Sequence, residues 1–342
     1  MIFRISLTLL MVCVAGCSPH KDAEALLDDY LKRLERVSGL EIAPVEPAER
    51  PAYPPRRLLL HSIEPPDIGW TELWGYRHCG LSELLGERNS VLGKHMQDST
   101  HFVMDARIIE RLRACLELID DDEQKALTRS LLTIKISQLP YRFSNATVAS
   151  TEMQTFWSYS APPLQPDSAG ISAALEALGV WASTGQMAES STPELVVLES
   201  QNSVLRQRGG GRTVKALLMV REKLEAANTL LASAASSRRF CPYNHPTEEL
   251  EWARNVMRKV FIGEVQPYIA QLNNSSLQLL EEFFELVEIQ PTETQEALAD
   301  FGQRLNQTQQ DFVSATKKHV ALWQEVFNSC HSSPRTQERT HD

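Results

Sequence analysis

Apolar residues recur every three or four positions along most of this chain, which is the spacing of one face of an α-helix. Residues 22–37, for example, carry Leu26, Tyr30 and Leu34 on one side and charged residues on the other. No block of alternating apolar and polar residues indicates a sheet, although residues 56–63 fit one short strand. The pattern therefore predicts an all-α fold, organised as a multi-helix bundle.

An apolar seam from Leu298 to Val326 gives the clearest helical signal, and His319 lies within it. Such a seam packs against neighbouring helices in a bundle or against a partner chain, and packing within the bundle is the expectation here. A neutral histidine is tolerated in a protein interior. His319 is therefore predicted to be a core residue with satisfied hydrogen bonds rather than a metal ligand.

Prolines and glycines divide the helical pattern into regions. Seven prolines lie between residues 43 and 66, a density that breaks helix and strand and predicts an extended segment, either a spacer or a strip along the surface. The run Gly209–Gly211 predicts a flexible break. The expected organisation is a signal peptide at 1–16, an anchor and first helix at 17–40, a Pro-rich extended segment at 41–67, a helical body at 68–330 with a candidate subdomain boundary near 161–211, and a disordered tail at 331–342.

The first twenty residues, MIFRISLTLLMVCVAGCSPH, have the layout of an export signal. Arg4 precedes an apolar run of about half the length that a bilayer-spanning helix needs. Residues 14–17 then resemble the lipobox of bacterial lipoproteins, in which the signal is removed before a cysteine that carries the lipid. The resemblance implies lipidation, with palmitate as one acyl chain, at Cys17, and Ser18 in place of Asp favours the outer membrane. The alternative is an ordinary signal peptide with an incidental cysteine.

Export would leave four cysteines in the folded part of the chain, and in an oxidising compartment they are expected to pair. Four cysteines allow three connectivities, of which pairing of neighbours in sequence is one. No C-x-x-C or closely spaced His/Cys pattern is present, which argues against a redox centre or a zinc site. The helical body is therefore predicted to be stapled by structural disulfides among Cys79, Cys115, Cys241 and Cys330.

Charge and motif content narrow the classes of function. The net charge of −10 disfavours contact with nucleic-acid backbones. No G-x-S-x-G or H-E-x-x-H motif occurs, so no catalytic residue, metal or cofactor is predicted. The expected partners are the membrane, through the lipid anchor, and a protein of the cell envelope.

One polar segment, GLSELLGERNSVLGKHM at residues 80–96, raises the question of a phosphate-binding loop. Such a loop needs four residues between its first glycine and the Gly-Lys pair, followed by Ser or Thr. Here six residues separate Gly86 from Gly93, and His95 stands where the hydroxyl residue should be. The segment is therefore not a phosphate loop.

A helix through this segment would gather its apolar residues on one side, with Arg88 in the middle of that side and His95 near it. A buried guanidinium needs a partner, because an isolated buried charge costs several kcal/mol. The main interpretation is an ion pair with an acid on a neighbouring helix. The alternative is an anion site formed by this candidate polar cluster, which consists of Glu87, Arg88, Asn89, Lys94 and His95.

Several stretches resemble the domain-of-unknown-function family 3080 of proteobacterial lipoproteins. They are CGLSELLGERNSVLGK, FCPYNHPTEELEW, VFIGEVQPYIAQL and HVALWQEVFNSC, and the resemblance covers essentially the whole chain after the signal peptide. It implies a lipid-anchored envelope protein, but it carries no activity and no catalytic residue.

Together these patterns predict an outer-membrane lipoprotein that faces the periplasm and acts as a non-enzymatic interaction or scaffold protein. The alternative is a binding protein or enzyme that acts on an anionic envelope ligand through the region around Arg88.

Overall fold

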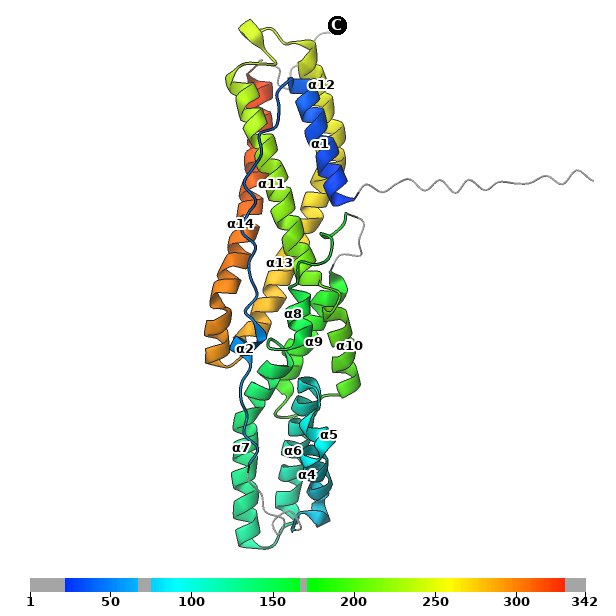
Figure 1. Cartoon of the computed structure of the whole chain (residues 1–342), viewed down its shortest axis with the longest axis vertical. Helices are drawn as coiled ribbons and strands as arrows, with labels where there is room; N and C mark the ends of the chain where they lie inside the picture. The colour runs from blue at the N-terminus through cyan, green and yellow to red at the C-terminus, as the bar shows by residue number, and fades with distance from the viewer. Residues whose placement is uncertain (1–21, 67–74, 167–170, 330–342) are drawn as a thin grey trace, which may run out of the picture.

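The computed structural model describes residues 22–66, 75–166 and 171–329, and every regular element among them is helical. The predicted all-α, multi-helix fold is confirmed. The molecule is a long rod, with one set of helices along its upper part and a helical hairpin projecting from its lower end (Figure 1). Cys17 and Cys330 lie outside the described residues, as do residues 1–16, the predicted signal peptide, and residues 331–342, the predicted tail.

The upper part is a bundle whose helices run along the axis of the rod (Figure 1). The π-helical segment η3 joins α12 to α13 without a break in the rod. Tyr30, Leu34, Phe261 and Trp323 are among the buried side chains that fill its core. The elements are α1 (Ala23–Ser38), α11 (Gly209–Ser236), α12 (Glu248–Val256), η3 (Met257–Val265), α13 (Gln266–Glu288) and α14 (Thr292–Asn328).

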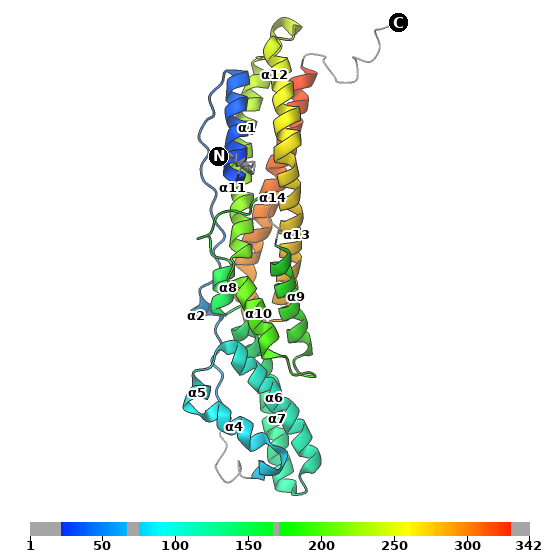
Figure 2. The ribbon, with the colours of Figure 1, turned by 90° about the vertical axis from the view of Figure 1, so that its right-hand side faces the viewer.

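Three shorter helices flank the lower half of this bundle on the side of α11 and α13 (Figure 1, Figure 2). α9 packs against both α10 and α13, and α10 also contacts α6, so this group connects the bundle to the hairpin below. They are α8 (Thr151–Phe156), α9 (Ser172–Met187) and α10 (Leu195–Leu205).

The lower end is an antiparallel pair, α6 (Asp98–Leu118) and α7 (Asp122–Ala146), with α4 (Leu81–Asn89) packed on α6 and the single turn α5 (Val91–Lys94) following it. The upper ends of α6 and α7 share the core of the main bundle. Their lower ends enclose a second, smaller hydrophobic core.

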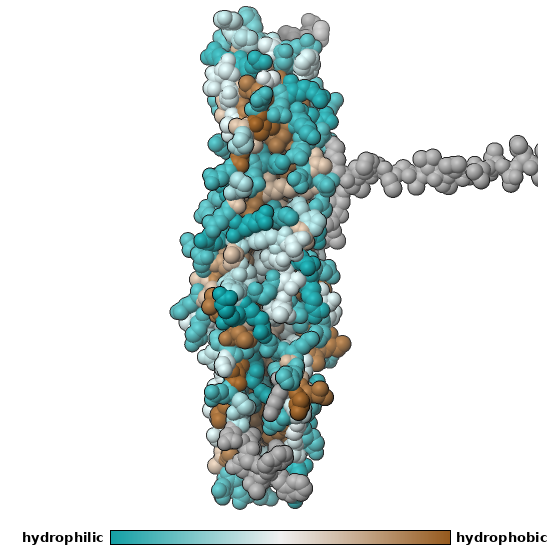
Figure 3. Space-filling view, in the orientation of Figure 1, coloured by the Kyte–Doolittle hydropathy of each residue, from teal (hydrophilic) through white to brown (hydrophobic). Residues whose placement is uncertain are grey.

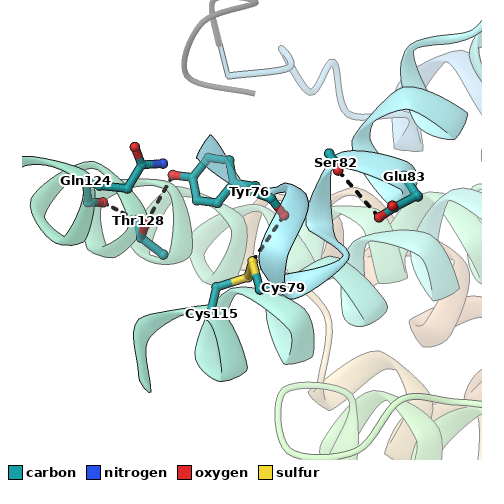
Figure 4. The surroundings of a disulfide bond; sticks show 7 residues. All are labelled: Tyr76, Cys79, Ser82, Glu83, Cys115, Gln124 and Thr128. Atoms are coloured by element: carbon teal, nitrogen blue, oxygen red, sulfur yellow. Dashed lines mark hydrogen bonds between the residues drawn. A yellow bond between two sulfur atoms is a disulfide. The ribbon is translucent and has the colours of Figure 1, made fainter. Parts of the chain in front are cut away.

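A disulfide staples this second core. The 3₁₀ turn η1 (Arg77–Cys79) brings Cys79 to Cys115 in the last turn of α6, with an S–S distance of 2.01 Å (Figure 4). Tyr76 reaches across to α7, where its hydroxyl bonds to that of Thr128 at 3.1 Å (Figure 4). Cys241 is buried and also disulfide-bonded, and its partner lies outside the described residues. The pairing of Cys241 with Cys330 therefore stays a prediction.

The Pro-rich segment is extended and lies along the surface of the bundle. It leaves the end of α1, turns at Gly39, which has a left-handed φ of 62°, and runs back down the rod (Figure 1, Figure 2). Glu222 accepts a hydrogen bond from the Ala48 N–H at 2.8 Å, and Tyr159 donates one to the Pro51 carbonyl at 2.6 Å. These bonds attach the segment to the body at intervals.

Two local predictions are wrong. Residues 56–59 form one helical turn, α2 (Arg56–Leu59), instead of a strand, because Pro55 starts a turn and no neighbouring strand is present to pair with it among the described residues. Gly209–Gly211 is the buried first turn of α11 rather than a flexible break. A Cβ on Gly211 would overlap the Ser158 carbonyl, so the glycines serve close packing.

Candidate functional site

The segment around Arg88 is a helix, a turn and a short second helix. α4 ends at Asn89, and the Ser90 hydroxyl donates to the Glu87 carbonyl at 2.7 Å and accepts from the Gly93 N–H at 2.9 Å. A Cβ on Gly93 would overlap the carbonyl oxygens of Glu87 and Arg88. The serine and the glycine are therefore explained by the turn that they build.

This turn changes the face on which the following residues lie. A single helix through residues 80–96 would place Val91 and Leu92 on the apolar side, but they are 78% and 81% exposed. The break at Ser90 redirects the chain and turns both side chains outward.

The structure places the described members of the candidate polar cluster in different surroundings. Arg88 is buried, whereas Glu87, Asn89 and His95 are exposed. The side chain of Lys94 lies outside the described part of the molecule. The interpretation of these five residues as one anion site therefore stays a prediction.

Arg88 instead contacts Asp105, a fully buried carboxylate on α6. Its Nε lies 3.1 Å from Asp105 Oδ1, and Lys135 Nζ lies 3.0 Å from the same oxygen. Arg142 Nε lies 3.0 Å from the other oxygen, Oδ2. One acid on a neighbouring helix thus receives three cations, and we call these four residues the Asp105 cluster.

Helix geometry explains why these residues meet. Lys135 and Arg142 are two turns apart on α7 and so share a face, which points toward α6. His101 lies one turn before Asp105 on the same face of α6. His101 is 9% exposed, and its Nδ1 has no hydrogen-bond partner.

The electrostatics of the cluster are set by burial and by its excess of cations. Burial by itself raises the pKa of Asp105, but the positive charges of Lys135, Arg88 and Arg142 outweigh it, so the pKa is lowered. Burial, aided by Arg88 and Arg142, lowers the pKa of His101. Burial also lowers the pKa of Lys135, against the attraction of Asp105. Asp105 is therefore an anion and His101 is neutral near pH 7.

A small polar cavity lies at the start of α6, and no residue of the Asp105 cluster lines it. It has a volume of about 130 Å³ and is lined by Arg56, Asp98, Ser99 and Asn202, among others. Arg56 pairs with Asp98 at 2.6 Å, while Arg56 Nε and Asn202 Oδ1 have no partner. A cavity of this size and polarity suits a few ordered water molecules.

His319 in the upper bundle is a hydrogen-bonded core residue, as predicted. Its Nδ1–H donates to Asn228 Oδ1 at 2.8 Å, and its Nε2 accepts from the Tyr30 hydroxyl at 2.6 Å. The Trp323 indole donates to the same hydroxyl at 2.9 Å. Because burial lowers the pKa of His319 to about 3, the ring is neutral.

Three members of the Asp105 cluster were not predicted. Asp105 stands in the apolar stretch HFVMDARII, and Lys135 stands in LLTIKIS. Because a charge inside an apolar stripe must be paired, the sequence signal that marks Arg88 also marks both of these residues.

Within the described residues, no helix has the length and apolar content to cross a bilayer, and no group of three His, Cys, Asp or Glu side chains is arranged to bind a metal ion. The model of one family, described as a protein of unknown function (DUF3080), matches residues 27–334. No curated protein and no solved structure matches the chain.

Proposed function

Since the chain belongs to the DUF3080 family of proteins of unknown function, no activity follows from its relatives, and we propose its role from its own features. We infer that it is an outer-membrane-anchored periplasmic lipoprotein that acts as a non-enzymatic interaction or scaffold protein of the cell envelope.

The proposed anchor rests on the lipobox-like residues that end at Cys17 and on the cysteine chemistry of the body. The first described helix begins at Ala23, six positions after Cys17, so the body follows the proposed anchor closely. The buried Cys79–Cys115 disulfide agrees with an oxidising compartment. Several acyl chains at about 0.8 kcal/mol per buried CH₂ would hold the protein at the membrane.

The observation that carries the interaction role is the exposed pair Val91 and Leu92. Both side chains stand on a turn that Ser90 and Gly93 hold in place, so they are presented on a defined surface. Figure 3 shows apolar surface over α5 and over the lower end of α10, where Val196 is 74% exposed. Neighbouring exposed apolar side chains on a rigid surface are typical of protein contact sites.

The anchor is tested by labelling cells with radioactive palmitate. Cys17→Ser should abolish incorporation of the label into the protein. Cys13→Ser is the matched control, because Cys13 lies within the proposed signal peptide, and it should leave labelling unchanged. Labelling that survives Cys17→Ser would contradict the proposal.

The interaction role is tested with a photo-crosslinking amino acid placed at Leu92 in intact cells. The control position is Ser130, an exposed polar residue of α7. We expect a discrete crosslinked product at Leu92 that is absent at Ser130 and is lost when Val91→Asp is added. If Leu92 and Ser130 give the same background, the α5 surface is not a contact site.

A further inference from the structure

The Asp105 cluster contains more positive than negative charge. Arg88 and Arg142 each bring one guanidinium charge, and Asp105 supplies one negative charge. With Lys135 protonated, the surplus is two positive charges. Asp98, the next acid along α6, is paired with Arg56 at 2.6 Å. No other acid among the described residues pairs with the three cations.

Such a surplus is costly in a protein interior, because each charge loses hydration that its neighbours must replace. A cluster that served only to fix the helices would need one cation for its one carboxylate. Pairing with Asp105 therefore accounts for one cation of the cluster and leaves the other two without a structural role.

The donors that remain free point to an anion. Arg88 and Arg142 each use Nε for Asp105, and their outer Nη nitrogens make no hydrogen bond to any described residue. Each of these side chains is 10% exposed, so an edge of each remains at the surface. His101 adds an unpartnered Nδ1 within the same electrostatic environment.

We propose that the Asp105 cluster binds the phosphoryl group of a small phosphorylated ligand through the outer nitrogens of Arg88 and Arg142, with the buried Lys135 adding positive charge behind them. Each planar guanidinium fork can donate two parallel hydrogen bonds to two oxygens of a tetrahedral phosphoryl group. A phosphate monoester carries about −1.5 to −2 charges near neutral pH, which equals the surplus on the cluster, whereas a carboxylate would neutralise only half of it. The rest of the ligand lies outside, since only the edge of the cluster is exposed. This proposal does not depend on the lipid anchor.

The test measures the melting temperature and the binding isotherm of the purified full-length protein with inorganic phosphate and with glycerol 3-phosphate. Chloride at the same ionic strength is the reference. We expect saturable stabilisation by both phosphates and none by chloride.

Arg142→Gln should weaken phosphate binding at least tenfold, because it removes one fork and half of the surplus charge. This variant leaves Asp105 paired with Arg88 and Lys135, so it should fold. Arg129→Gln, on the exposed side of the same helix, is the matched control and should bind as the wild type does. If stabilisation is absent, matches that of chloride, or falls equally in both variants, the proposal is overturned.

The source of the phosphoryl group is resolved with glycerophosphoglycerol, a soluble diester that has the chemistry of a lipid headgroup. Tighter binding of glycerol 3-phosphate, the monoester, indicates a free phosphorylated metabolite. Tighter binding of the diester, still sensitive to Arg142→Gln, assigns the site to a lipid headgroup.

Discussion

Removing the carboxylate of Asp105 should open the lower hairpin. In Asp105→Asn the shape of the side chain is kept, but three cations that now share one counter-ion at 3.0–3.1 Å would face one another without it. Breaking a buried ion pair by removing one partner costs about 3–5 kcal/mol, because the remaining charge is left uncompensated. The loss here should reach at least that range, since more than one cation loses its partner.

Lys135→Met is the matched variant, because it removes one of the positive charges that the Asp105 cluster has in surplus. Asp105 keeps both arginines, and no uncompensated charge is created. Methionine has a similar shape to the lysine stem and packs well in an apolar setting. We therefore expect a change in the free energy of unfolding within about 1 kcal/mol.

Native-state hydrogen exchange, read by mass spectrometry, localises the effect. Since each 1.4 kcal/mol is a factor of ten, α7 amides in Asp105→Asn should exchange about one hundred to several thousand times faster than in the wild type. Amides in the upper half of α14, far from the cluster, serve as the internal reference and should change little. Equal acceleration of α7 exchange by Asp105→Asn and Lys135→Met would refute the idea that the cations are in surplus.

Two further predictions concern the upper bundle and the helix contacts. Burial lowers the pKa of His319 to about 3, from an ordinary histidine pKa of 6.5. Below pH 6.5 the unfolded chain therefore binds a proton at this residue that the native protein does not bind. The free energy of unfolding should fall by about 1.4 kcal/mol per pH unit on acidification in this range. Urea titrations at pH 7 and pH 5 should show this slope in the wild type and a flatter one in His319→Gln; equal slopes would contradict the assignment. Gly211→Ala should destabilise by about 1–3 kcal/mol through overlap with the Ser158 carbonyl. The control is Gly86→Ala, in a helix with open space around the glycine, and it should stabilise the protein by about 0.5–1 kcal/mol. If Gly211→Ala is instead the more stable of the two variants, the close contact at Gly211 can relax.

Helical periodicity was sufficient to predict the class of fold, because each long helix buries one face. α1 and α14 show this most directly: Leu26, Tyr30 and Leu34 are buried as the spacing predicts, and so is the seam from Leu298 to Val326. The extended course of the Pro-rich segment was also predictable, since proline excludes both regular structures.

Local breaks and distant partners could not be predicted in the same way. A continuous helix through residues 80–96 fits the apolar pattern as well as the observed helix, turn and short helix do. Only the Ser90 hydrogen bond and the close approach at Gly93 distinguish the two. The need of Arg88 for an acid was clear from its surroundings in sequence. Which acid it meets depends on how α4, α6 and α7 pack, because Asp105 is 17 residues away and Arg142 lies on another helix.

The hydrogen bond between Tyr30 and His319 joins residues that are 289 positions apart. α1 packs on α11, α12 and η3, and the Tyr30 ring contacts Phe261, so the first helix cannot dock fully until residue 265 has been synthesised. A protein built in this way stays loosely structured at its leading end for most of its synthesis. Deleting α14 from His319 onward would remove two hydrogen-bond partners of Tyr30, His319 and Trp323, and would loosen α1 at the opposite end of the polypeptide.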